Sequence, residues 1–221
     1  MSAAPRIAVV DYGMGNRRSV QKALEHVGAI APITSEVEVL SSSDGLVIPG
    51  VGAFPRAMEN LAARDLIEVI RERAREGTPL LGICLGMQLL FDGSVEQEST
   101  PGLGLIAGDV TWLSAGRLRL PHIGWNDVCF EARSALTAGL PPGGCPFYHV
   151  HWLAPRPREP ADIVGSTEYG ERFATMVQRG NVAGVQFHPE KSSTHGLQLL
   201  ANFVGQCTAS PAQALGVAPA A

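Results

Sequence analysis

Hydrophobic residues in the first half of the chain follow two alternating spacings, one typical of buried strands and one typical of amphipathic helices. Short continuous apolar runs predict three buried strands, at 7–11, 46–48 and 79–83. Apolar residues recur at helical spacing over 20–27 and over 66–74, and Asp65 is placed to cap the second helix. Strands and helices in alternation predict a parallel sheet with helices on both of its faces.

Shorter segments of alternating polarity follow in the second half. They predict β-strands at 109–113, 127–130, 147–150, 163–168, 173–179 and 182–187. Turn residues separate these segments, and we interpret them as antiparallel strands appended to the parallel core. A last helix around 197–204 precedes an Ala/Pro-rich stretch at 209–221, which is typical of a frayed tail. The predicted fold is thus α/β, with an open and mostly parallel sheet and an appended antiparallel region in a single domain at 1–208.

The composition is that of one compact globular domain. Hydrophobic residues make up 45% of the 221 residues and charged residues only 17%, which disfavours disorder. A net charge of −4 provides no basic surface for nucleic acid. The four cysteines form no C-x-x-C pair, so the sequence predicts neither a zinc site nor a disulfide framework, and reduced thiols in the cytosol are expected.

No segment has the length of a membrane anchor. The apolar run at 7–10 is too short for the apolar region of a secretory signal. The longest apolar stretch, 80–91, is interrupted by two glycines and a glutamine and falls short of the ~20 residues that a membrane span requires. The sequence therefore predicts a cytoplasmic protein without membrane contact.

The segment 80–88, LLGICLGMQ, carries the sharpest chemical signal. An apolar strand meets a helix at Cys84, which is flanked by Gly82 and Gly86. This is the nucleophile-elbow pattern with cysteine in place of serine: small neighbours allow a sharp, strained turn, and the helix N-terminus stabilises a thiolate and an anionic intermediate. The alternative is a small buried apolar cysteine beside two packing glycines.

A base and an orienting group occur together at 185–190, VQFHPE. On an extended segment His188 and Glu190 lie on the same side, so the carboxylate can fix the imidazole tautomer while the ring faces a thiol. Taken alone, His-x-Glu is more often a surface hydrogen bond than a catalytic pair. The presence of Cys84 elsewhere in the chain favours the catalytic interpretation.

The glycine-rich turn 49–54, PGVGAF, follows a buried strand. It can aim a backbone N–H at a developing oxyanion, with Leu85 N–H as second donor, although it also fits a simple strand-to-helix turn. No G-x-G-x-x-G or P-loop pattern occurs, so no nucleotide cofactor is predicted. His149 and His151 can face one way on a strand, but no third ligand lies nearby in sequence, and no metal is predicted.

Together these segments resemble the triad-type, class I glutamine amidotransferases and, within them, the glutaminase subunits of imidazole glycerol phosphate synthase of histidine biosynthesis. The resemblance covers nearly the whole chain, through the segments 11–16 (DYGMGN), 48–52 (IPGVG), 82–88 (GICLGMQ), 121–126 (PHIGWN) and 186–192 (QFHPEKS). The G-x-C-x-G and F-H-P-E patterns are shared with the glutaminase modules of anthranilate synthase and GMP synthetase. The 121–126 segment is similar to this subfamily alone.

The resemblance implies that L-glutamine is hydrolysed to glutamate and ammonia through a cysteine thioester. It also implies a heterodimer with a (βα)8-barrel cyclase subunit, which uses the ammonia to make imidazole glycerol phosphate and aminoimidazole carboxamide ribotide. The implied catalytic residues are Cys84 as nucleophile, His188 as base and then acid, and Glu190 as its orienting group. The other implied roles are oxyanion donors at Gly50, Val51, Gly52 and Leu85, glutamine contacts at Gln88, His151, Trp152 and Leu153, and a cyclase interface at Asn16, Trp125, Tyr148 and Lys191.

The chain departs from the family pattern at 147–153, FYHVHWL, where the family reads F-Y-F-V-H-[ST]-Y. Backbone donors survive side-chain changes, so a contact to the glutamine α-carboxylate after His151 is still expected. Two alternatives remain: the glutaminase of another amidotransferase, serving anthranilate or pyridoxal phosphate synthesis, and a catalytically silent regulatory protein of the same fold. The 121–126 segment argues against the first, and the intact Cys84, His188 and Glu190 against the second.

Overall fold

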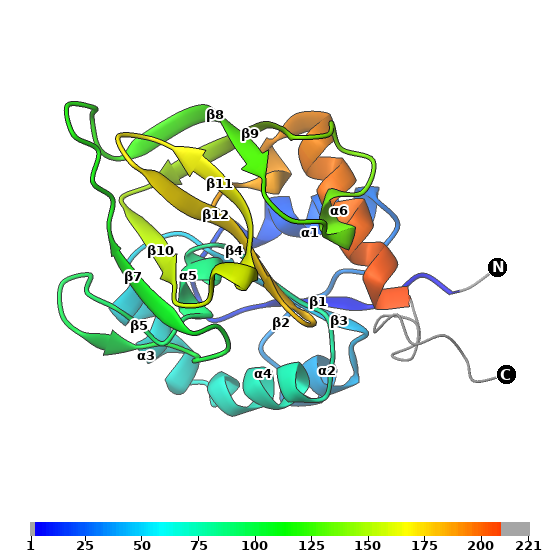
Figure 1. Ribbon diagram of the computed structural model, residues 1–221. Helices are drawn as coiled ribbons and strands as arrows, with labels where there is room; N and C mark the ends of the chain where they lie inside the picture. Colours follow the sequence, from blue (N-terminus) through cyan, green and yellow to red (C-terminus); the bar gives the residue numbers. More distant parts are fainter. Residues whose placement is uncertain (1–2, 209–221) are drawn as a thin grey trace, which may run out of the picture.

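The computed structural model describes residues 3–208, and the predicted tail at 209–221 lies outside them. Its main feature is a nine-stranded sheet with the order β2-β1-β3-β4-β13-β12-β11-β8-β9 (Figure 1). The strands from β2 to β13 in this order run parallel, and those from β12 to β9 pair antiparallel. The predicted α/β fold with a mostly parallel region and an antiparallel region is confirmed.

The parallel half holds the most buried part of the chain. Its strands are β1 (Ile7–Val10), β2 (Ile33–Thr34), β3 (Gly45–Gly50), β4 (Leu80–Cys84) and β13 (Val182–Val185). Every residue of β1, β3, β4 and β13 is buried, as expected for strands covered on both faces. The continuous apolar runs in the sequence result from this double burial.

Helices cover both faces of the parallel half and create two cores (Figure 1). Helices α1 (Arg17–His26) and α6 (Ser193–Thr208) pack on one face. The other face carries α2 (Val37–Ser42), α3 (Phe54–Ala62), α4 (Leu66–Arg75) and the short α5 (Leu85–Leu89). Asp65 occupies the position before α4 as predicted, but the predicted cap is wrong: Asp65 has φ +55° and its side chain caps nothing.

The antiparallel half consists of β8 (His122–Phe130), β9 (Gly144–His151), β11 (Ile163–Glu168) and β12 (Arg172–Arg179). A separate four-stranded sheet is formed by β10 (Leu153–Pro157), β7 (Gly108–Trp112), β5 (Gly93–Ser94) and β6 (Thr100–Pro101). Short 3-10 turns lie between β8 and β9 (Ala135–Thr137) and between β10 and β11 (Pro160–Asp162), and a third (Pro189–Lys191) lies between β13 and α6.

The structure corrects two predicted pairings. The strand predicted at 182–187 is not appended to the core but is part of it, because β13 pairs parallel with β4 and antiparallel with β12. The strand predicted at 109–113 belongs to the second sheet, paired with β10. Strand polarity depends on which neighbour the chain meets, and alternation of side chains does not encode that.

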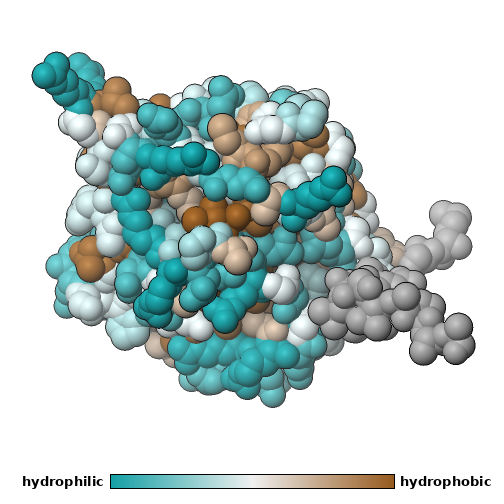
Figure 2. Space-filling model, in the orientation of Figure 1, coloured by the Kyte–Doolittle hydropathy of each residue, from teal (hydrophilic) through white to brown (hydrophobic). Residues whose placement is uncertain are grey.

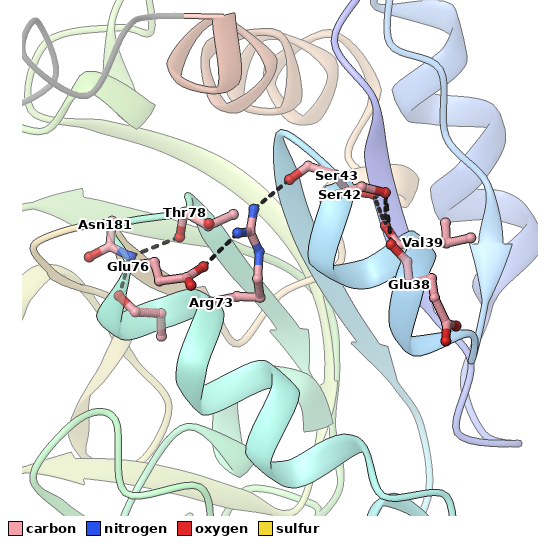
Figure 3. A network of polar contacts seen from close by, with 9 residues as sticks. Glu38, Val39, Ser42, Ser43, Arg73, Glu76, Thr78 and Asn181 are labelled. Atoms are coloured by element: carbon pink, nitrogen blue, oxygen red, sulfur yellow. Dashed lines mark hydrogen bonds and ion pairs between the residues drawn. The ribbon is translucent and has the colours of Figure 1, made fainter.

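Polar contacts connect the amino ends of the parallel strands (Figure 3). Asn181, just before β13, donates from Nδ2 to the carbonyl oxygens of Ala74 at 2.9 Å and Thr78 at 2.8 Å. Arg73 of α4 donates from Nη2 to the Ser43 carbonyl at 2.7 Å and pairs through Nη1 with Glu76 at 2.6 Å. The loops that lead into β3, β4 and β13 are thereby tied to one helix.

The molecular face in Figure 2 is largely hydrophilic, and its apolar residues gather in small patches. Within residues 3–208, no helix is long and apolar enough to cross a membrane.

Candidate active site

Cys84 lies at the carboxyl end of β4, the strand between β3 and β13, where the chain turns at once into α5. Its backbone has φ +54° and ψ −111°, a conformation that L-residues rarely adopt. A Cβ on Gly86 would lie 1.8 Å from the Ile48 carbonyl oxygen, and one on Gly82 would lie 2.5 Å from the Gly86 carbonyl oxygen. Both glycines are therefore required by close packing at the elbow.

His188 follows β13 at the same end of the sheet, and its Nδ1 lies 2.9 Å from Oε1 of Glu190. The expected extended segment is wrong, because residues Pro189–Lys191 form a 3-10 turn, and this turn rather than strand alternation brings the two side chains together. Both side chains are almost fully buried. Because a carboxylate only accepts hydrogen bonds, Nδ1 of His188 carries a proton. Nε2 is then the ring nitrogen that is available to exchange a proton with the Cys84 thiol.

The electrostatics of His188 favour its charged form. Burial alone would lower its pKa, but the negative charge and hydrogen bond of Cys84, together with those of Glu190, raise the pKa to about 10. With its pKa raised in this way, the His188 ring holds its proton at neutral pH. A protonated ring next to Cys84 can stabilise a thiolate at that position.

The turn after β3 lies beside this pair. A Cβ on Gly50 would lie 2.6 Å from Oη of Tyr12 and 2.7 Å from Cβ of Leu85, and Gly52 has φ +116°. The buried hydroxyl of Tyr12 donates to the Pro49 carbonyl at 2.6 Å. Burial and the nearby Cys84 charge raise the Tyr12 pKa, against the opposing charge of Arg17, so the hydroxyl keeps its proton. The first peptide of the turn is therefore held in place.

A pocket of about 340 Å³ opens over Cys84. The predicted residues that line it are Val51, Gly52, Cys84, Leu85, Gln88, His151, Trp152, Leu153, His188 and Lys191. Glu96 also lines it, and its Oε2 accepts a hydrogen bond from the Phe54 backbone N–H at 2.7 Å. Sequence reasoning missed Glu96, which lies in a loop without periodicity. Trp152 keeps 48% of its surface exposed at the pocket mouth.

Two buried glutamine side chains contact each other beneath the pocket. Gln88 Nε2 lies 3.0 Å from Gln186 Oε1 and 3.4 Å from the Leu153 carbonyl oxygen. Gln186 Nε2 in turn lies 3.6 Å from Cys84 Sγ, and the Val150 carbonyl oxygen lies 3.7 Å from the same sulfur. Gln186 was not predicted as a site residue, although it is the first residue of the 186–192 segment that carried the resemblance.

Three buried histidine rings, His122, His149 and His151, are in contact behind the pocket. His122 Nδ1 lies 2.9 Å from His151 Nε2, and the His122 and His149 rings stack at 4.8 Å. Burial lowers the pKa of His122 to about 4 and that of His151 to about 3, and it holds the pKa of His149 well below its usual value. All three rings are neutral at pH 7. Among residues 3–208, no group of three or more His, Cys, Asp and Glu side chains is arranged to hold a metal ion.

The residues predicted at a partner interface lie close to the triad. Tyr148 accepts a hydrogen bond at its carbonyl from the His188 backbone N–H at 2.9 Å, and Trp125 is its cross-strand neighbour in β8, with 55% of its surface exposed. Asn16 Nδ2 lies 3.5 Å from Glu190 Oε1. Lys191 is exposed at the pocket rim. A partner that touched Tyr148 or Asn16 would therefore lie one or two hydrogen bonds away from His188.

Comparison with known proteins gives the same picture. The family model "Glutamine amidotransferase class-I" matches residues 8–207. The chain is 51% identical to imidazole glycerol phosphate synthase subunit HisH of Moorella thermoacetica, over 89% of this chain and 93% of the relative. It is 46% identical to the HisH subunit of Bacillus cereus strain AH187, over 90% and 94%.

Solved structures support the fold. A solved glutamine amidotransferase superposes with a TM-score of 0.70 at 22% identity, covering 95% of this chain and 99% of that one. The structure of PurLQS from Thermotoga maritima gives a TM-score of 0.74 at 21% identity, covering 91% and 98%. The fold and the sequence thus agree, and this chain belongs to the class I glutamine amidotransferases and, within them, to the family of HisH subunits of imidazole glycerol phosphate synthase.

Proposed function

We propose that Cys84, His188 and Glu190 carry out the glutamine hydrolysis of this chain and that the ammonia released passes to a cyclase subunit. As a HisH-family protein, the chain is the glutamine amidotransferase subunit of imidazole glycerol phosphate synthase, an enzyme of histidine biosynthesis. The observation that carries the residue assignment is the strained Cys84 beside the His188–Glu190 pair, at the base of a pocket of about 340 Å³.

Acylation begins when the Cys84 thiolate attacks the side-chain amide carbon of glutamine. The carbonyl π electrons move onto oxygen, where the N–H groups of the 50–52 turn and of Leu85 stabilise the negative charge. The His188 imidazolium then gives its proton to the departing nitrogen. The C–N bond breaks, ammonia leaves, and a thioester remains on Cys84.

In deacylation His188 acts as a base, whereas in acylation it acts as an acid. The neutral ring takes a proton from water, and the water oxygen attacks the thioester carbonyl. Collapse of the intermediate breaks the C–S bond, restores the thiolate and imidazolium, and releases glutamic acid, which ionises in solution. Glu190 keeps the proton on Nδ1 throughout, so that Nε2 is the atom that exchanges it.

The pocket offers complementary groups for the two ends of the substrate. Glu96 places a carboxylate on the pocket wall for the α-ammonium group of glutamine. The backbone at Trp152 and Leu153 lines the same pocket and can donate to the α-carboxylate whatever side chains it carries. Gln88 completes the wall beside Cys84.

We further propose a (βα)8-barrel cyclase as the heterodimer partner, contacting Asn16, Trp125, Tyr148 and Lys191, and a location in the cytoplasm, where the four free cysteines stay reduced. The 50–52 turn would act as the gate. Its glycines allow two backbone arrangements, and only one of them directs an N–H at the oxyanion. Partner binding favours that arrangement by population shift, and one donor is worth on the order of 10²–10³ in rate.

Steady-state glutamine hydrolysis tests this proposal. The purified chain is measured alone, with the cyclase, and with the cyclase plus an analogue of its substrate. We expect low activity alone and the highest activity in the third case. Equal activity in all three would refute the gate and leave the triad untouched, whereas absence of hydrolysis in all three would refute the triad.

The two alternatives are not favoured. The HisH relatives match 89–90% of the chain at 46–51% identity, which disfavours a glutaminase of anthranilate or pyridoxal phosphate synthesis. A catalytically silent regulatory protein would have no need of a strained cysteine backbone beside a histidine that a buried carboxylate orients.

A further inference from the structure

Gln186 is fully buried and touches the reacting sulfur, yet the mechanism above gives it no part. We propose that Gln186 is a catalytic residue whose amide N–H donates to the Cys84 thiolate and stabilises it as attacking and as leaving group. This inference rests on the proposed role of Cys84 as nucleophile.

The orientation of the Gln186 amide follows from a backbone group. The Leu153 carbonyl oxygen can only accept, so the Gln88 atom 3.4 Å away is its NH2 group. The same NH2 group lies 3.0 Å from Gln186, which must therefore present its oxygen to Gln88. The other end of the Gln186 amide, its NH2 group, then faces Cys84 Sγ at 3.6 Å.

The Leu153 carbonyl is itself fixed from the other side. His151 Nδ1 lies 2.8 Å from it and must donate, which leaves His151 Nε2 as an acceptor for the N–H of His122 Nδ1 at 2.9 Å. His122 Nε2 then accepts from Asn126 Nδ2 at 3.2 Å, and the same Asn126 NH2 group donates to the Glu168 carbonyl at 3.0 Å. Each N–H in this chain of contacts has its own acceptor, since the NH2 groups of Gln88 and Asn126 each supply two N–H bonds. The histidine rings are neutral and therefore keep these tautomers. The amide of Gln186 is therefore locked with its donor toward the sulfur.

The second neighbour of the sulfur explains why a donor is needed. The Val150 carbonyl oxygen at 3.7 Å accepts from a thiol S–H but repels a thiolate. The Gln186 amide N–H that faces the same sulfur offsets that repulsion, and its hydrogen bond to the sulfur strengthens when the sulfur is charged. The thioester sulfur is a weak acceptor, so the amide favours expulsion of the thiolate during deacylation.

The test compares Gln186→Met, which keeps the length of the side chain and removes the donor, with Gln178→Met on β12 as a matched control. Gln178 bonds to Ser134 and Gly180, away from the pocket. Two readouts are used on the full chain: alkylation of Cys84 by iodoacetamide as a function of pH, followed by mass spectrometry of its peptide, and kcat and KM for glutamine in complex with the cyclase. Unfolding curves and co-elution with the cyclase establish that each variant is folded.

We expect Gln186→Met to slow alkylation at neutral pH, to move the alkylation profile to higher pH, and to lower kcat by about 10- to 100-fold, the worth of a hydrogen bond to a charged group. Gln178→Met should change neither. A folded Gln186→Met variant with the wild-type alkylation profile would overturn the inference. If that variant does not fold, Gln186→Asn is used instead, because its shorter amide cannot reach the sulfur and the same losses are expected. A wild-type alkylation profile of Gln186→Asn would also overturn the inference.

The outcomes separate this inference from the function on which it rests. If Cys84 of the wild-type chain reacts no faster than the exposed Cys129, the nucleophile assignment itself fails. If Cys84 reacts fast and is indifferent to residue 186, only the role of Gln186 fails.

Discussion

The two ends of the parallel strands are built on opposite principles. At the amino ends, Asn181 and Arg73 donate to the backbone carbonyls of Ser43, Ala74 and Thr78 and so hold the loops that lead into β3, β4 and β13 to α4 (Figure 3). At the carboxyl ends, β4 finishes in a residue with φ +54°, and Gly50 and Gly86 allow the chain to pass where a Cβ would collide. At the amino ends, polar side chains form hydrogen bonds that stabilise the fold. At the carboxyl ends, the backbone is strained and the proposed reactive groups are accessible.

The difference teaches why we place catalysis at one end. The carboxyl ends of β3, β4 and β13 are neighbours, so the proposed oxyanion turn, nucleophile and base meet there without any long-range adjustment. Strain at Cys84 can persist because the amino ends fix the same strands in register. Substitutions at the two ends should therefore separate activity from stability.

The largest effect is expected for Cys84→Ala. Loss of the nucleophile should reduce glutamine-dependent synthesis by the complex by on the order of 10⁴ or more, while added ammonium salt still supports synthesis. Parallel assays with glutamine and with ammonium measure both. Persistent glutamine turnover would falsify the assignment.

His188→Asn should cost nearly as much as loss of the thiol, and Glu190→Gln less, because the orienting group exchanges no proton. Initial rates of glutamine hydrolysis rank the three variants. A loss at Glu190 that equals or exceeds the loss at His188 would require another division of roles.

Glu190→Gln should also change the pH dependence of kcat. The carboxylate helps to raise the His188 pKa to about 10, so its removal lowers that pKa and the imidazolium acid is lost at lower pH. The alkaline decline of kcat should begin earlier in the variant. The sign is the same for stability: the contribution of His188 is full below its unfolded pKa of 6.5 and disappears as pH rises through the folded value. An unmoved alkaline limb would contradict the electrostatic role.

At the opposite end, Asn181→Ala removes two hydrogen bonds to backbone carbonyls and should lower the free energy of unfolding by about 1–3 kcal/mol. The values of kcat and KM should stay within twofold of wild type, because the loop lies at the amino ends of the strands. Chemical denaturation and steady-state kinetics give the two numbers. A loss of kcat with unchanged stability would erase the distinction between the two ends.

The smallest effect compares two inactive variants. Cys84→Gly should be more stable than Cys84→Ala by about 1 kcal/mol, since glycine tolerates the positive φ and this gain exceeds its entropic disadvantage. Denaturant midpoints at equal slope decide the comparison. Equal midpoints, or a more stable alanine variant, would mean that the elbow is not strained.

Much of the fold was predictable where the determinant is local. The alternation at 163–168 matches β11 (Ile163–Glu168), and the apolar run at 79–83 lies within one residue of β4 (Leu80–Cys84). The position of β13 inside the parallel core was not predictable, because its parallel partner β4 lies about a hundred residues earlier in the sequence, and only its antiparallel partner β12 is a sequence neighbour, joined to it through the turn at Gly180 and Asn181. Pairing partners are set by the assembled sheet as a whole and not by the segment alone.

The candidate site divides in the same way. The motifs point to Cys84, His188 and Glu190 because their residue types and flanking glycines carry the chemistry. They cannot indicate that Gln186 turns its NH2 group to the sulfur, since that orientation is decided by the Leu153 carbonyl on another strand. Glu96 has no pattern at all, and only the folded loop brings its carboxylate to the pocket.

The place of β13 in the sheet has a consequence for the folding of this chain during translation. It follows all the other strands in chain order, yet it sits in the middle of the sheet, between β4 and β12. During translation Cys84 leaves the ribosome long before β13, the strand that precedes His188. In the nascent chain the Cys84 thiol therefore has no His188 imidazolium beside it. We expect the sheet to close late, and the reactive thiolate to arise only when synthesis of the strand region is finished.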